Sequence, residues 1–153
     1  MPQLQAAAAR HESPLCVVMI DLDFFKQVND IHGHLVGDQT LSAVGRALRE
    51  NSRRSDLIAR YGGEEFAVLC PNTDFHTGLE VAERLRAAIE RLNPNELGHP
   101  GPQTVSLGVA IQSPNRRLTP EELLDHADLA LYRAKDRGRN CTVAWLDGEE
   151  YAR

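Results

Sequence analysis

The chain of 153 residues has no excess of basic residues: 17 lysines and arginines stand against 22 aspartates and glutamates, a formal net charge of −5. Nucleic-acid-binding domains usually carry a positive balance, so the composition argues against that class. A small phosphorylated ligand stays compatible with it, because the charge around one site can differ from the net charge. At this length one domain is the simplest organisation.

The sequence has few cysteines and no apolar run of membrane-spanning length. Its three cysteines, Cys16, Cys70 and Cys141, lack the paired spacing of a metal site, so we expect ordinary thiols in a reducing compartment. A bilayer span needs about 20 apolar residues, and the polar, alanine-rich start is unlike a signal peptide. We therefore expect a cytoplasmic domain without direct membrane contact, even where the parent protein is membrane-anchored.

Two common nucleotide-binding motifs are absent as well. The sequence contains no G-x-x-x-x-G-K-[ST] segment and no G-x-G-x-x-G segment, so it gives no support to a P-loop or Rossmann site. The six histidines show no metal-ligand spacing, and we interpret them as structural or exposed. Any nucleotide chemistry must use other groups.

What the sequence does have is a tight acidic turn, Gly-Gly-Glu-Glu-Phe at 62–66, between two apolar, β-prone stretches. The pattern predicts a hairpin over 57–70 with carboxylates at its turn. A second acidic pair, Asp21 and Asp23, follows the continuous apolar run 15–20, which is typical of a central strand covered on both faces. Two strand ends that carry carboxylates suggest one divalent-metal site built from two parts of the chain.

Helical patterns occupy much of the remaining chain. Apolar residues at three- and four-residue spacings predict helices over 38–49 and 77–92. Thr119 is followed by proline and, three residues on, by glutamate, which predicts the start of a helix that ends near Arg137 before Gly138. We further expect a short helix over 3–10, one or two helical turns over 24–30, a loop bracketed by Gly33 and Gly37, a loop over 93–102, and strands over 104–111 and 141–145.

This order of elements is β-α-β-β-α-β with a further helix and strand. It predicts an α/β sandwich of the ferredoxin-like type, in which helices pack on a mainly antiparallel sheet. Residues 1–14 are the remnant of an N-terminal helix or linker in this interpretation, and residues 15–153 form the domain.

The carboxylates of Asp21 and Glu64 are the first candidates for chemistry. If their strands are adjacent, they can share Mg²⁺, which prefers oxygen ligands and often uses one or two carboxylates together with substrate phosphates. Two such ions activate an attacking hydroxyl and stabilise a leaving oxygen. From spacing alone, solvated turn residues are an equally good interpretation.

Three further pairs of residues can each be interpreted in two ways, as ligand-binding residues or as ordinary structural ones. Asn29 and Asp38 can read a guanine edge with an amide and a carboxylate, but aspartate at a helix start is also an ordinary N-cap. Lys135 and Arg139 can grip phosphates, yet cations near a helix C-terminus are favourable by themselves. Arg53 and its neighbour can stack on a purine or bind a phosphate, or they can be part of a solvated linker.

Four stretches match one family in the same order. They are DLDFFKQVNDIHGHLVGD at 21–38, RYGGEEF at 60–66, TVSLGVA at 104–110 and ADLALYRAKDRGRN at 127–140. With the spacing between them they cover nearly all of 15–143, and the chain resembles the GGDEF domains, the diguanylate cyclases of bacterial cyclic di-GMP signalling. Glutamate at the third motif position is a variant that active members of the family accept. The resemblance implies a nucleotidyl-cyclase or polymerase-palm-like fold.

The resemblance also implies roles for the matching residues. The catalytic set is Asp21, Glu64 and Glu65, with the role of Glu65 as a base left open. Asp21 and Glu64 match the ligands of Mg²⁺ or Mn²⁺, with the Leu22 carbonyl as a further ligand. The implied substrate-binding set is Phe24, Phe25, Lys26, Asn29, Asp38, Leu41, Gly62, Gly63, Lys135 and Arg139.

Within this set the resemblance assigns different parts of GTP. The amide and carboxylate of Asn29 and Asp38 read guanine, and Phe25 and Leu41 are the apolar walls of the pocket. Phe24 and Lys26 match positions that approach the triphosphate, and the cations of the last helix grip it. The two glycines of the turn let the backbone approach the nucleotide.

The implied reaction condenses two GTP into cyclic di-GMP and releases two pyrophosphates in a facing homodimer. Arg53 and Asp56 match the R-x-x-D inhibitory site of the family and Arg84 a second arginine that completes it, which implies inhibition by cyclic di-GMP. The family's D-x-L-T-G-L-x-N-R stretch is missing, so we expect a fragment of a protein with an upstream sensory domain. A nucleotide receptor without turnover and a different purine nucleotide cyclase or palm-like transferase are the alternatives.

Overall fold

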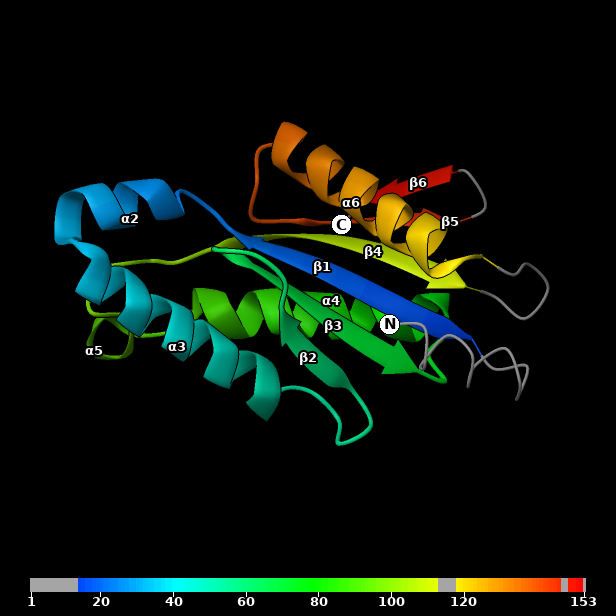
Figure 1. The fold of residues 1–153 in the computed structure, drawn as a ribbon, viewed down its shortest axis with the longest axis horizontal. Coiled ribbons are helices and arrows are strands. Elements are labelled where there is room, and N and C mark those ends of the chain that lie inside the picture. The colour runs from blue at the N-terminus through cyan, green and yellow to red at the C-terminus, as the bar shows by residue number, and fades with distance from the viewer. Residues whose placement is uncertain (1–13, 113–117, 147–148, 153) are drawn as a thin grey trace.

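The structure, a computed structural model, describes residues 14–112, 118–146 and 149–152. These residues form a six-stranded sheet with helices packed on both of its faces (Figure 1). The strand order is β2-β3-β1-β4-β5-β6, and neighbouring strands are antiparallel except for β4 and β5. The expected α/β sandwich with a mainly antiparallel sheet is confirmed.

The elements follow one another along the chain with short connections. Their bounds are β1 Leu15–Leu22, α2 Phe25–His32, α3 His34–Glu50, β2 Leu57–Arg60, β3 Glu65–Pro71, α4 Phe75–Glu90, α5 Pro94–Leu97, β4 Val105–Gln112, α6 Pro120–Asp136, β5 Thr142–Leu146 and β6 Glu149–Ala152.

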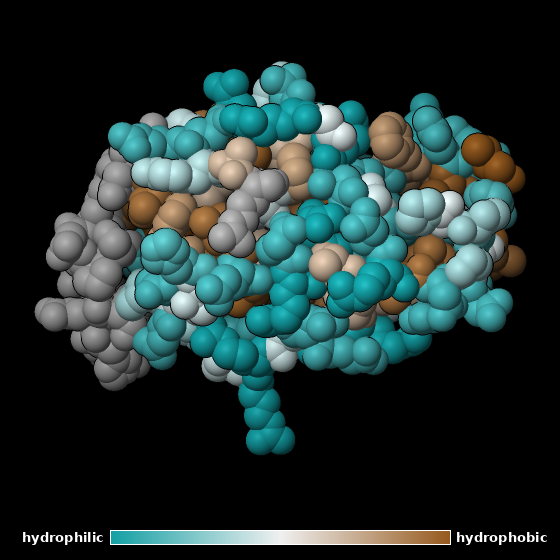
Figure 2. Space-filling model, turned by 180° about the vertical axis from the view of Figure 1, so that it is seen from behind, coloured by the Kyte–Doolittle hydropathy of each residue, from teal (hydrophilic) through white to brown (hydrophobic). Residues whose placement is uncertain are grey.

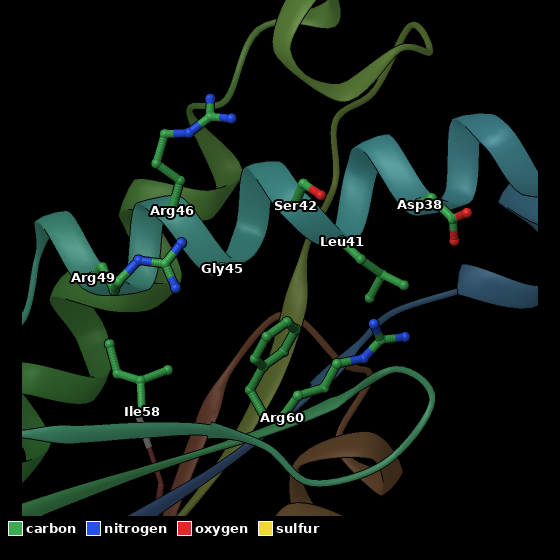
Figure 3. A pocket seen from close by; sticks show the side chains of 9 residues that line it. Asp38, Leu41, Ser42, Gly45, Arg46, Arg49, Ile58 and Arg60 are labelled. Atoms are coloured by element: carbon green, nitrogen blue, oxygen red, sulfur yellow. The ribbon is translucent and has the colours of Figure 1, made fainter.

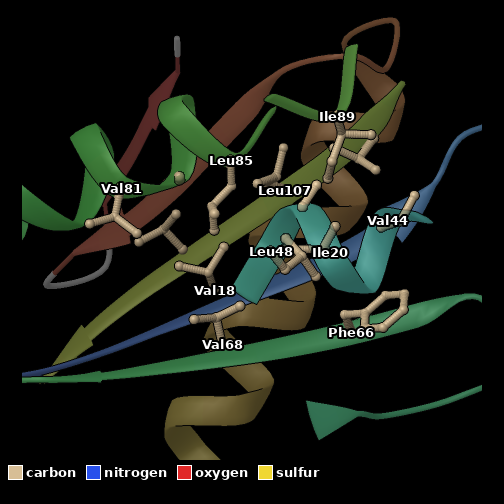
Figure 4. Close-up of a cluster of buried hydrophobic side chains, with 14 of the residues drawn as sticks. Val18, Ile20, Val44, Leu48, Phe66, Val68, Val81, Leu85, Ile89 and Leu107 are labelled. Atoms are coloured by element: carbon tan, nitrogen blue, oxygen red, sulfur yellow. The ribbon is translucent and has the colours of Figure 1, made fainter. Parts of the chain in front are cut away.

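Strand β1 lies at the centre of the sheet, and all eight of its residues are buried. Its side chains alternate between two cores, because successive residues of a strand point to opposite faces. Val18 and Ile20 pack with α3 and α4 in the larger core (Figure 4), whereas Val17 and Met19 belong to the core beneath α6. Burying each such side chain contributes roughly 1.5–3 kcal/mol, so the apolar run that predicted this strand also anchors the site at its end.

Helix α6 crosses the other face of the sheet and packs closely on β4. It begins with the expected capping box: the Thr119 hydroxyl accepts from the Glu122 backbone N–H, and the Glu122 carboxylate accepts from the Thr119 N–H. Gly108 in β4 permits the close packing, because a Cβ there would overlap the backbone of Ala127 and Leu131. The helix therefore carries its last turn to a fixed place beside the end of β1.

The expected loop between Gly33 and Gly37 is wrong. Gly33 alone separates the two helices, with a φ of 91°, and α3 already begins at His34. Gly37 is buried inside α3, so Asp38 lies in the helix and is not its N-cap. In sequence, a glycine within a helical pattern looks like the end of a helix. In the structure, Gly37 lies inside α3, where the Asn29 side chain packs against it.

Two smaller expectations also need correction. The loop over 93–102 contains the short helix α5, which Asn93 caps by accepting from the Glu96 N–H. The strand near 141–145 is followed by a further one, β6, an exposed edge strand of sequence EEYA whose polarity gave no strand signal. The helix expected over 3–10 lies outside the described residues.

The surface seen from behind is mainly hydrophilic, with apolar side chains in small separate groups (Figure 2). Ile31 and Leu35, at the corner between α2 and α3, are the most exposed of the large apolar residues, at 72% and 87%. Within the described ranges, none of the helices has the length and apolar character to cross a membrane.

Candidate active site

The two acidic motifs meet at one end of the sheet. Asp21, near the end of β1, pairs in register with Glu65, the first residue of β3. The Leu22 N–H donates to the Glu64 carbonyl oxygen at 3.2 Å, so the hairpin turn is bound directly to the end of the central strand. The structure thus places the carboxylates of Asp21 and Glu64 side by side, as the sequence predicted.

Asp21 is only 3% exposed, so the solvated interpretation is wrong for this residue. One of its carboxylate oxygens, Oδ2, accepts from the Lys135 ammonium of α6. The other, Oδ1, is buried and has no hydrogen-bond donor among the described residues. A buried, unpaired carboxylate oxygen is costly, and a bound cation would satisfy it.

The excess of negative charge at this end of the sheet also affects Glu64 and Glu65. Burial, together with the charge of Asp21, raises the pKa of Glu64 above its ordinary value, although Lys135 opposes the shift. Burial also raises the pKa of Glu65, with smaller contributions from Asp21 and Asp128. A cation placed here would relieve this repulsion and favour the ionised carboxylates.

The donor set fits a hard divalent ion. Asp21 and Glu64 offer carboxylate oxygens and Leu22 a backbone carbonyl, while no group of three His, Cys, Asp or Glu side chains in the described ranges is arranged to hold a metal. A site of two carboxylates suits Mg²⁺, which usually completes its octahedron with water and substrate phosphates.

The two residues expected to read guanine lie where α2 and α3 meet. The Asn29 side chain packs against Gly37, in the space that a Cβ would occupy, and the Phe25 ring would lie 3.2 Å from that Cβ. Asp38 follows Gly37 directly along α3, so both expected residues belong to the corner between the two helices. Leu41 is buried one helical turn further along α3.

A cavity of about 640 Å³ opens between α3 and the hairpin. In Figure 3, Asp38 and Leu41 on α3 face Arg60 on β2 across this cavity. Phe25 and Asn29 are not among its lining residues. The complete lining is Asp38, Leu41, Ser42, Gly45, Arg46, Arg49, Ile58, Arg60 and Phe66.

Sequence reasoning missed the arginines of this cavity. Arg60 donates to the carbonyl oxygens of Gly62 at 3.3 Å and Gly63 at 2.6 Å, and so holds the acidic turn in place. Arg46 and Arg49 belong to the exposed side of α3. The helix predicted over 38–49 already contained both of them together with Asp38, so they could have been found from the sequence.

The expected phosphate-binding residues gather next to Asp21. Lys135, in the last turn of α6, contacts the Asp21 carboxylate. The Arg139 guanidinium lies over the Phe24 ring, 5.0 Å from its centroid, which is a favourable cation–π distance. Lys26 is exposed on α2 and the glycines at 62 and 63 are exposed at the turn, so all of them are accessible to a ligand.

The expected inhibitory residues lie at the other end of the hairpin. Arg53 donates to both carboxylate oxygens of Asp56, from its backbone N–H at 2.8 Å and from Nη2 at 3.2 Å. Arg84 of α4 donates from Nε and Nη2 to the Asn51 carbonyl oxygen, at 3.1 and 2.9 Å. These contacts bring the three residues to one surface, separated from the metal-type site by the length of β2.

The mainly antiparallel sheet with helices on both faces, and the acidic turn beside the end of its central strand, define a palm-like α/β domain. Residues 1–141 match the family described as diguanylate cyclase, GGDEF domain. The chain belongs to this family.

Relatives and solved structures agree with this assignment. The chain is 42% identical over 142 residues to the probable diguanylate cyclase DgcT of Escherichia coli, covering 92% of this chain and 31% of that protein. The GGDEF domain of DgcB from Caulobacter crescentus, solved in complex with c-di-GMP, has a TM-score of 0.85 at 30% identity, with 94% and 84% of the two chains covered. The active GGEEF domain of a diguanylate cyclase from Vibrio cholerae has a TM-score of 0.85 at 28% identity, with 95% and 92% covered.

Proposed function

We propose that this domain condenses two molecules of GTP into cyclic di-GMP and releases two pyrophosphates. The observation that carries the proposal is the buried, unpaired Oδ1 of Asp21 beside Glu64, with Lys135 and Arg139 close by. The names of the relatives support it, as does the c-di-GMP complex of the DgcB domain.

Guanine would bind at the corner between α2 and α3. The Asp38 carboxylate accepts from N1 and the exocyclic amine, and the Asn29 amide binds O6 or N3. Phe25 and Leu41 are buried apolar side chains beside these groups, and they form the walls of the base site. An adenine would present an acceptor at N1, so the carboxylate favours guanine.

The triphosphate would extend toward the end of β1. Lys135 supplies a point charge and Arg139 a planar fork, and both are suited to phosphate oxygens. Asp21, Glu64 and the Leu22 carbonyl would hold Mg²⁺ or Mn²⁺. When bound, such an ion neutralises phosphate charge and lowers the pKa of a nearby hydroxyl.

Each domain holds one GTP, and two domains must face each other. The 3′-oxygen of one GTP attacks the α-phosphorus of the other, and the bond from that phosphorus to the pyrophosphate oxygen breaks. Glu65, whose pKa burial raises, takes up the hydroxyl proton at its carboxylate in this scheme. Positioning of the two substrates and electrostatic stabilisation supply most of the acceleration.

Cyclic di-GMP would also bind at Arg53, Asp56 and Arg84. The two guanidinium groups suit its phosphates, and the buried Asp56 carboxylate holds Arg53 in place. Bound product at the far end of the hairpin would hold two domains away from the facing arrangement, so the enzyme would be inhibited by its product.

The test is an incubation of the concentrated protein with GTP and Mg²⁺, with separate measurement of cyclic di-GMP and pyrophosphate. We expect two pyrophosphates to be released for each cyclic di-GMP formed. Glu64→Gln should form neither product. If the protein binds GTP without turnover, or yields a different nucleotide, the proposal is wrong.

A further inference from the structure

The second acid of the sequence pair, Asp23, has a different environment from Asp21. It is 5% exposed. Its carboxylate accepts from the Ser106 hydroxyl at 2.6 Å, the Thr104 hydroxyl at 2.7 Å and the Asn140 backbone N–H at 3.0 Å. Three donors occupy this carboxylate, so Asp23 has an internal role that the sequence alone did not reveal.

The Asn140 N–H belongs to a loop with an unusual backbone. Gly138, Arg139 and Asn140 have φ values of 114°, 67° and 46°. Only glycine adopts this left-handed region freely, and other residues keep it where the surrounding structure holds them. Arg139 and Asn140 therefore need external contacts to keep their conformation.

The contacts come from both sides of the loop. Asp23 binds the Asn140 backbone, as described above. From α4, Arg86 donates to the Asn140 side-chain oxygen at 2.9 Å, and the Asn140 amide donates to the Glu90 carboxylate at 2.8 Å. The residue after Arg139 is thus held by a carboxylate from the end of β1 and by two charged side chains from a helix.

Asp23 is close to both members of the Arg139–Phe24 stack. Phe24 follows Asp23 directly and has a φ of 56°, and its ring lies beneath the Arg139 guanidinium. Asp23 fixes the other partner through Asn140. The direction in which Arg139 presents its guanidinium therefore depends on Asp23.

We infer that Asp23 is a positioning residue that holds the 138–140 loop so that Arg139 faces the triphosphate. The inference rests on the proposed function, because it takes Arg139 as a phosphate ligand. Asp23 acts through Arg139 and does not contact the substrate. Its loss should weaken binding of the β- and γ-phosphates and leave recognition of the base intact.

The test variant is Asp23→Ala, which has no side-chain oxygen to accept from the Asn140 N–H. Calorimetry in EDTA compares the affinities for GTP and GMP, so that no metal contributes and no turnover occurs. We expect the wild-type preference for GTP over GMP to fall roughly tenfold, as for loss of one charge-assisted hydrogen bond, while the GMP affinity stays the same. Arg139→Gln should lose the same preference, and the double variant should be no worse than Arg139→Gln alone.

Two further variants make the result specific. Ser106→Ala removes another donor from the same carboxylate without touching the loop, and it should keep the wild-type preference. Asn140→Gly cuts the contacts to α4 and frees the backbone while leaving Asp23 in place. It should lose the preference selectively, and it serves as the test if Asp23→Ala does not fold.

The outcomes separate the two proposals. A wild-type protein that binds GTP and GMP equally overturns the phosphate site and the proposed function with it. If the wild type prefers GTP and Arg139→Gln loses that preference, retention of it in Asp23→Ala, or in Asn140→Gly where Asp23→Ala does not fold, overturns the positioning role alone. An equal loss of GTP and GMP affinity in Asp23→Ala would also overturn it, because the effect would then be general.

Discussion

The side-chain oxygen of Asn29 lies against Gly37, in the space that a Cβ would fill, and this contact sets how closely α2 approaches α3. Gly37→Ala should push the Asn29 amide away from Asp38 and crowd the Phe25 ring. We expect GTP affinity to fall tenfold or more, and overpacking to cost about 1–3 kcal/mol of stability. Calorimetry and thermal unfolding measure the two effects.

Gly45→Ala is the matched control on the same helix. A Cβ at Gly45 would lie 3.7 Å from the Phe66 ring, an ordinary contact. Alanine is a better helix former than glycine by about 0.5–1 kcal/mol, so this variant should unfold at the same or a higher temperature. If both glycines respond alike, the role given to the Asn29 contact is wrong.

Glu64 should destabilise the metal-free protein. Its pKa is raised by burial and by Asp21, so its ionised form is disfavoured in the folded state at neutral pH. Glu64→Gln removes this charge and should raise the free energy of unfolding by on the order of 1 kcal/mol or less, because the group is partly solvated. The melting temperature should rise slightly with it. Mg²⁺ should raise the melting temperature of the wild type and leave Glu64→Gln unchanged.

The exposed glutamate Glu80 provides the comparison. Glu80→Gln lies on α4 and should keep the wild-type response to Mg²⁺. A Mg²⁺ response of equal size in Glu64→Gln would show that the ion binds elsewhere.

Gly108 is the clearest test of the packing between α6 and the sheet. Gly108→Ala places a Cβ against helix backbone at Ala127 and Leu131, and backbone cannot move as a flexible side chain can. We expect a loss of stability of about 3 kcal/mol or more, at or above the usual range for overpacking. Chemical denaturation gives the value. Gly63→Ala, with open space around the added methyl group, should change the free energy of unfolding by less than about 0.5 kcal/mol.

Sequence and structure agree where a local pattern has one physical solution. The unbroken apolar run of β1 is typical of a strand covered on both faces, and the capping box at Thr119 fixes the start of α6. They disagree where packing decides. Gly37 resembles a helix end until the Asn29 side chain is seen against it, and the edge strand β6 has no apolar pattern.

The site shows the same division. The motifs indicated Asp21, Glu64 and Lys135, and the fold brings these three together. Asp21 and Asp23 look equivalent in sequence, yet one carboxylate oxygen of Asp21 is unpaired while Asp23 is fully hydrogen-bonded. The hydrogen-bond donors of Asp23 come from residues 80 or more positions away in the sequence. The spacing of nearby residues therefore could not distinguish the two aspartates.

Product inhibition should depend on Arg84. Arg84→Ala removes a guanidinium from the expected cyclic di-GMP site, and loss of charge-assisted hydrogen bonds raises a dissociation constant roughly 10- to 100-fold. We expect that increase in the inhibition constant without a change in the uninhibited rate. Arg53→Ala should act in the same direction, but it also breaks the bonds of Arg53 to Pro71 and Thr73. Arg91→Ala, at the end of the same helix, is the control and should keep the wild-type inhibition constant. An unchanged inhibition constant in Arg84→Ala would show that Arg84 does not bind the product.

Acid should destabilise the fold through His99, which is buried and stacked on His32 with ring centroids 5.5 Å apart. Burial and the proximity of His32 lower the pKa of His99, so below about pH 6.5 the unfolded chain binds the proton more readily than the folded one. This contribution to stability is complete above the unfolded pKa and is lost as the pH falls through the folded pKa. Thermal unfolding between pH 7.5 and pH 5 should show a falling melting temperature, on a scale of roughly 2–4 °C per kcal/mol. His99→Gln should flatten the profile, whereas substitution of the exposed His34 should not; identical slopes for all three proteins would assign the acid sensitivity to other groups.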